Sequence, residues 1–348
     1  MHTNTHILVI RLSAIGDVAM TVPVIKALAT QYPNINITIL TQPFLKPLFK
    51  QLPQNVHFME ADIKNKHKNI QGLNQLFRRI HAKHFTHIAD LHDVLRTKYL
   101  RARLHINNYK IAHINKHRKQ RKLLTRSHNK QLQPLHTQYQ NYADVFQKLG
   151  FPIQLEQQPN VQSVAVSQQP NTPTQTQPVN IGIAPFAAHK GKIYPLHLMQ
   201  QVVEQLNQQP HIQNIYFFCG KGQETHIINK WCSKYNKCNN ASQQLKSIEK
   251  ELQLMAKLRL LITMDSANAH LAAIAGTEVI TIWGATHPYA GFKAYNQKDE
   301  NIIQAQLPCR PCSIYGNKPC QRQDYACLNN IQPQQIIDKI MHNINNNT

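Results

Sequence analysis

The stretch ILVIRLSAIGDVAMTVP, residues 7–23, decides how the fold begins. Its first four residues are apolar and are typical of a short buried strand, and the pattern from about residue 18 to residue 30 is typical of a helix. Gly16 and Asp17 lie at the junction between the two. The free N–H groups of a helix N-terminus attract anionic ligands. An aspartate at this place therefore either caps the helix or has a chemical role of its own.

The same alternation of apolar run and amphipathic stretch continues along the first half of the chain. A helix ending at Gly150, in the position of a C′ glycine, closes this half. The other runs are the strands INITIL (35–40) and THIADL (86–91) and a helix over 94–104. Strands that alternate with helices indicate a parallel sheet covered by helices.

An uncharged stretch rich in Pro, Gln and Thr, residues 164–180, interrupts this pattern and is typical of a linker. The alternation then restarts: NIGIAP (180–185), a helix over 197–206, NIYFFCG (214–220), LRLLITM (258–264), a helix over 269–275, EVITIWG (278–284) and a last helix over 331–344. The sequence predicts an α/β protein of two Rossmann-like, doubly wound domains facing across a cleft. The expected parts are an N-terminal domain 1–165, a linker 166–179, a C-terminal domain 180–330 and a helix and tail 331–348.

The charge is strongly positive, with 39 Lys and Arg against 17 Asp and Glu, a formal net charge of +22. Such a field concentrates polyanions. The basic residues are dense over 64–130, which is either a solvated face or a docking surface for an anionic partner. Signatures of RNA-binding modules are missing, so a nucleic-acid-binding protein is the less favoured alternative. Because no apolar run is long enough to span a membrane and no signal peptide precedes the first strand, we expect a cytoplasmic protein.

The stretch LITMDSANAHLAAIAG, residues 261–276, reads as a strand, a turn and a helix. Asp265 and Ser266 form the turn, Ser266 suits a helix N-cap, and the helix begins at Ala267. The N–H groups of its first turn make an anion site, which His270 would reach. The simpler interpretation is a capped helix with a half-buried histidine.

Two further strand ends carry polar groups. The strand NIGIA ends in a loop with Lys192, which suits a phosphate, and the strand before CGKGQE (219–224) ends at a turn with Glu224, whose carboxylate suits ribose hydroxyls. Taken alone, each is equally well a solvated lysine or a first-turn helix carboxylate.

Together these motifs resemble glycosyltransferase family 9, the ADP-heptose:lipopolysaccharide heptosyltransferases. RLSAIGDVAMTVP resembles the first motif of that family, ADLHDVLRT resembles its D-L-Q-x-x-x-R-S segment, and HKGKIYP resembles its K-x-W-P loop. MDSANAHLAAIAGTEVITIWGATHP resembles the signature D-T-G-x-x-H-x-A-A-x-x-G, and CRPC resembles the C-x-P-C region. The matches run in order from about residue 7 to residue 340.

The resemblance implies a GT-B type fold and assigns roles to individual residues. It makes Asp17 the catalytic base. It makes the donor-binding set Lys192, Glu224, Asp265, Ser266, Ala267 and His270. It places at the acceptor or the cleft Arg11, Ser13, Gly16 and Arg96.

The implied activity is inverting, metal-independent transfer of heptose from ADP-heptose to a lipopolysaccharide core acceptor, lipid A–Kdo or heptose, with no cofactor. The sequence has no D-x-D element that would indicate a metal-dependent transferase. The expected partners are the nucleotide sugar, a phosphorylated glycolipid and the anionic inner face of the inner membrane, without a specific nucleic acid. The alternatives are a member of the family that uses another glycan or protein acceptor or another nucleotide sugar, and a nucleotide-sugar-binding module without catalysis.

Four cysteines near the C-terminus have C-x2-C-x7-C-x6-C spacing: Cys309, Cys312, Cys320 and Cys327. Four thiolates are a ligand set for zinc, although this spacing is irregular for a zinc ribbon. Reduced structural thiols or a redox-sensitive pair are the alternatives.

Overall fold

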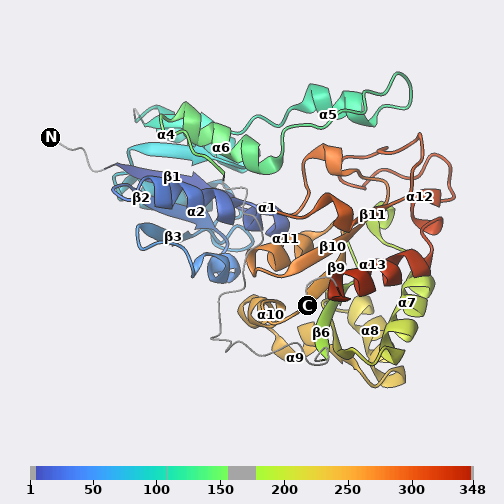
Figure 1. Cartoon of the computed structure of the whole chain (residues 1–348). Coiled ribbons are helices and arrows are strands. Elements are labelled where there is room, and N and C mark those ends of the chain that lie inside the picture. Colours follow the sequence, from blue (N-terminus) through green and yellow to red (C-terminus); the bar gives the residue numbers. More distant parts are fainter. Residues whose placement is uncertain (1–4, 108, 156–177, 346–348) are drawn as a thin grey trace. The chain divides into compact units, whose positions relative to one another are not determined.

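The computed structural model describes residues 5–107, 109–155 and 178–345. The chain divides into two compact units, which Figure 1 colours along the sequence. The first unit comprises residues up to 117 and residues 136–156, and the second comprises residues 118–135 and residues from 157 onward. Most of the predicted linker, 166–177, lies outside the described residues, so the linker stays a prediction.

The first unit is a five-stranded parallel sheet with the strand order β3-β2-β1-β4-β5. Its strands are β1 (His6–Ile10), β2 (Asn36–Thr41), β3 (Val56–Glu60), β4 (His87–Asp90) and β5 (Lys110–His113). The chain moves outward from β1 to β3 and then returns to place β4 on the other side of β1. This reversal beside β1 is the topological switch point of the sheet, where ligands of doubly wound proteins bind.

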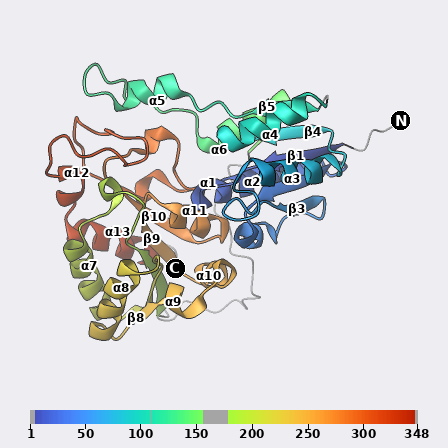
Figure 2. The same cartoon turned by 180° about the vertical axis from the view of Figure 1, so that it is seen from behind.

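Helices cover both faces of this sheet. They are α1 (Ile15–Ala19), α2 (Thr21–Gln31), α3 (Ile70–His81), α4 (Leu95–His105), α6 (Gln138–Lys148) and the 3-10 helix η1 (Pro43–Phe49). Leu8 and Ile10 point to the face that packs with α3 and α4, while α2 and α6 pack against each other (Figure 2). The α6 helix ends as predicted, with Gly150 at φ 95°. Only glycine adopts this conformation without a steric cost.

The second unit is a six-stranded parallel sheet with the order β11-β10-β9-β6-β7-β8. Its strands are β6 (Val179–Ala184), β7 (Ile212–Phe217), β8 (Cys238–Asn240), β9 (Leu260–Met264), β10 (Glu278–Trp283) and β11 (Ile302–Gln304). Here the direction of winding reverses between β6 and β9. The two doubly wound α/β units of the prediction are therefore confirmed, each with its own switch point.

The helices of the second unit are α7 (Leu196–Gln208), α8 (Gln223–Lys234), α9 (Ala241–Leu245), α10 (Ile248–Met255), α11 (Ala267–Ile274), α12 (Ala326–Asn329) and α13 (Pro333–Asn345). Short 3-10 turns are η2 (Lys190–Lys192), η3 (Pro288–Ala290) and η4 (Asp299–Asn301). Ile181 and Ile183 of β6 face a core shared with α7, α8 and α13, and α7 and α13 lie side by side (Figures 1 and 2). Gly182 points to the opposite face, where a Cβ would lie 2.5 Å from the side chain of Leu261.

Residues 118–135, which include α5 (Arg118–Thr125), pack with the second unit, whereas the sequence analysis placed them in the first. The ammonium group of Lys130 donates to three backbone carbonyls, of Pro308 (3.2 Å), Cys309 (2.7 Å) and Pro311 (3.1 Å). Arg121 donates to the hydroxyl of Tyr315 at 2.7 Å. Specific hydrogen bonds thus determine where this segment packs, and its basic composition did not reveal them.

None of the helices in the described part of the chain combines the length and the apolar character that crossing a membrane requires.

Candidate functional site

An ion pair between a partly buried lysine and a buried aspartate occupies the switch point of the second sheet. Lys192 follows β6, Asp265 follows β9, and Lys192 Nζ lies 3.0 Å from Asp265 Oδ2. The two side chains are 16% and 7% exposed. Because the two strands are neighbours in the sheet, their carboxyl ends bring the two charges together. Lys192 and Asp265, predicted separately, are therefore joined in one site.

The loop after β10 completes the surroundings of Asp265. The Thr286 hydroxyl, fully buried, donates to Asp265 Oδ2 at 2.8 Å. Arg310 holds this loop by donating to the carbonyls of Gly284 (2.6 Å) and Thr286 (3.0 Å). Burial lowers the pKa of Arg310 from its ordinary value. The sequence analysis did not single out Arg310, because an arginine inside C-x-P-C gave no sign of the carbonyls that it binds.

Backbone segments approach closely around Lys192. A Cβ on Gly284 would lie 2.5 Å from the carbonyl oxygen of Gly191, and Ala285 N donates to that oxygen at 2.8 Å. A Cβ on Gly316, whose φ is 74°, would lie 2.4 Å from Cγ of Lys192. Such contacts leave space only for glycine. They hold the lysine stem in one place.

The N-terminus of α11 lies next to Asp265. Ser266 is the N-cap residue, as predicted from its position, but its side chain does not cap the helix. Its hydroxyl instead pairs with the Thr263 hydroxyl at 3.1 Å. Ala267 begins the helix, and His270 is 5% exposed. The histidine is thus more deeply buried than the half-buried side chain of the simpler interpretation.

Glu224 lies in the first turn of α8, beyond the carboxyl end of β7. Its Oε2 accepts a hydrogen bond of 2.6 Å from the N–H of Gly220. Because β7 is the other neighbour of β6, Glu224 lies at the same edge of the sheet as Lys192. The hydrogen bond from Gly220 fixes the position of the carboxylate. The binding of ribose hydroxyls by Glu224 stays a prediction.

In the first unit, the switch point holds a second ion pair. Arg11 Nη2 lies 2.5 Å from Asp17 Oδ2, and the side chains are 9% and 29% exposed. Arg11 also donates to the carbonyl of Leu91, which follows β4, at 2.7 Å. Burial acts to lower the pKa of Arg11, but Tyr142 and Asp17 outweigh burial, so that the pKa is raised. Asp17 therefore faces a permanent cation.

His92 is a further member of this site that the sequence analysis did not select. Its Nδ1 accepts a hydrogen bond of 3.4 Å from Leu12 N, and burial, followed by the charge of Arg11, lowers its pKa to about 3. The histidine is neutral at physiological pH. Arg96, predicted from the same segment, lies in the first turn of α4, and its charge also lowers the pKa of His92.

Gly16 does not lie at the junction between strand and helix, where its place in the sequence had put it. Residues 11–14 connect β1 to α1, the Ser13–Ala14 peptide between them is cis, and α1 has already begun at Ile15. Gly16 is thus a helical residue without a positive φ. Ser13 is half-buried in the connection. The strand–helix junction is confirmed, but the residues that form it are those before the glycine.

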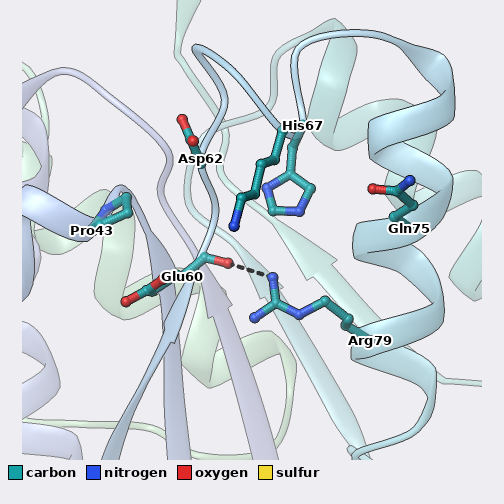
Figure 3. A pocket seen from close by; sticks show the side chains of 7 residues that line it. Pro43, Glu60, Asp62, His67, Gln75 and Arg79 are labelled. Carbon is teal, nitrogen blue, oxygen red and sulfur yellow. Dashed lines mark hydrogen bonds between the residues drawn. The ribbon is translucent and has the colours of Figure 1, made fainter.

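A cavity of about 350 Å³ opens beyond the carboxyl end of β3, between the loop 61–69 and α3 (Figure 3). Arg79 points into it and donates to the carbonyl of Glu60 at 3.2 Å. His67 is 4% exposed, and burial, followed by the charge of Arg79, lowers its pKa. The rest of the lining is Pro43, Asp62, Lys66 and Gln75. No motif of the sequence analysis pointed to this cavity.

The four C-terminal cysteines are reduced. Within the described ranges, their sulfur atoms do not form a group of three ligand atoms within 4.8 Å of one another. Burial raises the pKa of Cys312, and it raises that of Cys327 to about 11.

Solved structures of a family 9 glycosyl transferase and of heptosyltransferases superimpose on this chain. A family 9 glycosyl transferase from Veillonella parvula is 17% identical and superimposes with a TM-score of 0.69 over 98% of this chain and 97% of its own. The E. coli heptosyltransferase WaaC, solved with ADP, gives 15% identity and a TM-score of 0.65 over 97% and 100%. The same enzyme has been solved with ADP-2-deoxy-2-fluoro heptose. Lipooligosaccharide heptosyltransferase 2 from Campylobacter jejuni is 24% identical over 111 residues, 32% of each chain.

Two doubly wound units, each with a charged switch point, give the chain the GT-B type of fold that these neighbours share. Residues 73–322 match the profile of glycosyltransferase family 9 (heptosyltransferase). The match covers more than half of the chain, so this chain belongs to glycosyltransferase family 9. Membership of this family selects an enzyme over the nucleic-acid-binding alternative.

Proposed function

We propose that the protein is an inverting, metal-independent transferase that moves heptose from ADP-heptose to a lipopolysaccharide core acceptor. The observation that carries the proposal is the Lys192–Asp265 pair at the switch point of the second unit. The names of the similar proteins agree with it. WaaC is a heptosyltransferase solved with ADP and with an ADP-heptose analogue, and the Campylobacter relative is a lipooligosaccharide heptosyltransferase.

In this proposal the second unit binds the donor. Lys192 neutralises the diphosphate, and Asp265 holds the ammonium group in place until the nucleotide arrives. The N–H groups at the start of α11, next to Ser266 and Ala267, add donors for the leaving ADP. His270 supports this turn from within the helix, and Glu224 takes the ribose hydroxyls. Donors fixed in advance at a developing charge contribute about 3 kcal/mol each to transition-state stabilisation.

In the first unit, Asp17 is the proposed general base. Its side-chain contacts with Arg11 (2.5 Å) and with the N–H of Ala14 (3.4 Å) both use Oδ2. The proposal assigns Oδ1 to the acceptor hydroxyl, which a base must approach to within about 3 Å. Oδ1 accepts the proton as the acceptor oxygen bonds to the anomeric carbon and the bond to ADP breaks on the opposite side. Attack from the opposite side inverts that carbon.

The acceptor is proposed to bind at the carboxyl edge of the first sheet, with Arg11, Ser13, Gly16 and Arg96 beside it. The cavity next to β3 lies at this same edge, because all five strands are parallel. The adjacent loop exposes three lysines within residues 64–68. These charges suit a phosphorylated glycolipid and the anionic surface of the inner membrane, where each contributes about 1 kcal/mol. The enzyme would then work in the cytoplasm as a peripheral membrane protein.

The nucleotide is tested by thermal unfolding with ADP, UDP or GDP at one salt concentration. A ligand that binds only the folded protein at 100-fold excess over its Kd adds about 2.7 kcal/mol of stability. We expect a shift with ADP. A shift with UDP or GDP instead would retain the family and exclude ADP-heptose, leaving the alternative of another nucleotide sugar.

The base is tested by Asp17→Asn, assayed with ADP-heptose and a lipopolysaccharide core acceptor. We expect turnover to fall by at least 100-fold, because general-base catalysis contributes about 10²–10⁴-fold. The Kd for ADP should stay within two- to threefold, since the proposed donor groups belong to the other unit. Near-normal turnover would remove Asp17 as the base. If the wild-type enzyme transfers only to an acceptor other than the lipopolysaccharide core, the result would support the alternative of another glycan or protein acceptor.

A further inference from the structure

Three side chains of the types that can ligate a metal lie together in the first unit, apart from the residues assigned to transfer. His117, His136 and Asp144 each offer one ligand atom, and these atoms lie within 4.8 Å of one another. Nδ1 of His136 is 3.7 Å from Oδ2 of Asp144, and the two imidazole centroids are 5.7 Å apart. Among the residues that the structure describes, this is the one such group of three His, Cys, Asp or Glu.

Local structure holds each of the three in place. His117 has φ 46°, a left-handed conformation that histidine adopts more readily than most residues, and its N–H donates to Oδ1 of Asn115 at 3.0 Å. His136 directly precedes Thr137, the N-cap of α6, whose hydroxyl accepts from Gln140 N. Asp144 lies on α6, which is fixed by its buried face. The ligands therefore come from one ordered turn and one packed helix.

The donor set selects the kind of ion. Two imidazoles with one carboxylate are ligands for zinc and similar divalent transition metals, and three protein ligands leave one position for water. Magnesium and calcium prefer sites built from oxygen ligands, and the net charge of +22 gives no general attraction for cations. Zinc–nitrogen and zinc–oxygen bonds are about 2.0–2.2 Å, which places tetrahedral ligand atoms about 3.4 Å apart. Small rotations of His136 and Asp144, 59% and 40% exposed, close the remaining distance.

We propose that His117, His136 and Asp144 bind one divalent transition cation, and that the ion joins the two ends of the segment 118–135. His117 is the last residue of the first unit before this segment, and His136 is the first residue after it. An ion bound to both histidines closes the base of an 18-residue excursion that packs with the second unit. The site is structural and does not take part in glycosyl transfer.

The experiment is a titration of the metal-free, full-length protein, without a histidine tag, with Co²⁺ and with Zn²⁺. We expect one equivalent of Co²⁺ to give the visible absorption of a nitrogen- and oxygen-ligated ion without thiolate charge-transfer bands. Zn²⁺ at 100-fold excess over its Kd should raise Tm by about 5 °C. His136→Ala and Asp144→Ala, both at exposed side chains, should each weaken Co²⁺ binding by at least 10-fold. His128→Ala, an exposed histidine inside the excursion, is the matched control and should bind as the wild type does.

Unchanged Co²⁺ binding in both His136→Ala and Asp144→Ala would overturn the proposal. Strong thiolate charge-transfer bands would also overturn it, because they would assign the ion to the cysteines. Folding of each variant is checked by its Tm without metal. The role of the ion is tested by limited trypsin digestion, which we expect Zn²⁺ to slow within residues 118–130 of the wild type but not of His136→Ala. Cleavage that Zn²⁺ does not slow in the wild type would overturn the joining of the two ends.

Discussion

Replacing Lys192 by methionine tests the switch-point pair of the second unit most directly. At 3.0 Å and an effective dielectric constant of 20, the attraction between Lys192 and Asp265 is about 5.5 kcal/mol. The desolvation of both ions offsets most of this attraction, so a net coupling of about 1–3 kcal/mol remains. Lys192→Met leaves Asp265 buried with the Thr286 hydroxyl as its remaining side-chain partner among the residues that the structure describes. An uncompensated buried charge costs about 3–5 kcal/mol. Because the hydrogen bond from Thr286 still stabilises the Asp265 carboxylate, we expect the lower end of this range, a fall of about 3 kcal/mol in the free energy of unfolding.

The assay is denaturant unfolding of Lys192→Met, Asp265→Asn and the double variant, combined with calorimetric titration of ADP. The double variant should lose about 2 kcal/mol less than the sum of the single variants, because neither charge is then left alone. A charge-assisted hydrogen bond contributes about 1.5–3 kcal/mol, so Lys192→Met should weaken ADP binding by about 10- to 100-fold. Lys190→Met, in the same 3-10 turn but exposed, is the matched control and should bind ADP as the wild type does.

Two results would refute this reasoning. A coupling below about 0.5 kcal/mol would show that the pair is only a solvated contact, since exposed ion pairs contribute about that much. Equal loss of ADP affinity in Lys190→Met and Lys192→Met would show that the nucleotide responds to general positive charge and not to the built site.

Three further predictions concern other parts of the molecule. Gly316→Ala should reduce the affinity for ADP, because the added Cβ would displace Lys192. Gly150→Ala, at φ 95° with open space around the added Cβ, should lower stability by about 1–2 kcal/mol and leave the affinity for ADP unchanged. Equal ADP affinity in the two variants would contradict the prediction for Gly316. Burial lowers the pKa of His287 from 6.5 to about 4, so between these pH values the unfolded protein binds more protons than the folded protein. The contribution of His287 to stability should therefore fall by about 2 kcal/mol from pH 6.5 to pH 5. Denaturation curves at the two pH values should show that His287→Gln removes this contribution. Binding to anionic vesicles should weaken as the salt concentration rises, and also when the three lysines of residues 64–68 are replaced by alanine. Uncharged vesicles serve as the control. Binding that does not depend on salt would exclude electrostatic docking.

The sequence predicted the central strands of both sheets and missed strands at their edges. A central parallel strand is buried on both faces, so β1 and β9 read as continuous apolar runs. Edge strands are short and partly polar. The strand β8 is Cys-Asn-Asn and β5 is Lys-Ile-Ala-His, patterns that no periodicity distinguishes from a loop. The strand–helix alternation predicted two domains and the resemblance added the GT-B type, but neither predicted that residues 118–135 pack with the second unit.

The candidate site was predictable where a motif follows a strand directly. Asp17, Lys192 and Asp265 were selected because each comes after an apolar run, and parallel strands bring such residues to one edge. His92 and Arg310 were not selected, because their roles depend on hydrogen bonds to backbone groups far away in the sequence. The cavity beside β3 depends in the same way on the packing of a loop against α3, which a linear pattern does not encode.

The packing of residues 118–135 limits how this chain can be recombined with its relatives. A fragment that ends at residue 165 would carry Lys130 without the carbonyls of Pro308, Cys309 and Pro311, and a fragment that begins at residue 180 would lack the ammonium group that those carbonyls bind. A chimaera that joins the first half of this chain to the second half of another enzyme would therefore pack residues 118–135 against a second unit whose contact residues differ. With the acceptor assigned to the first unit, as proposed above, exchanging acceptor specificity between this chain and a relative requires three crossover points, so that residues 118–135 stay with the second unit.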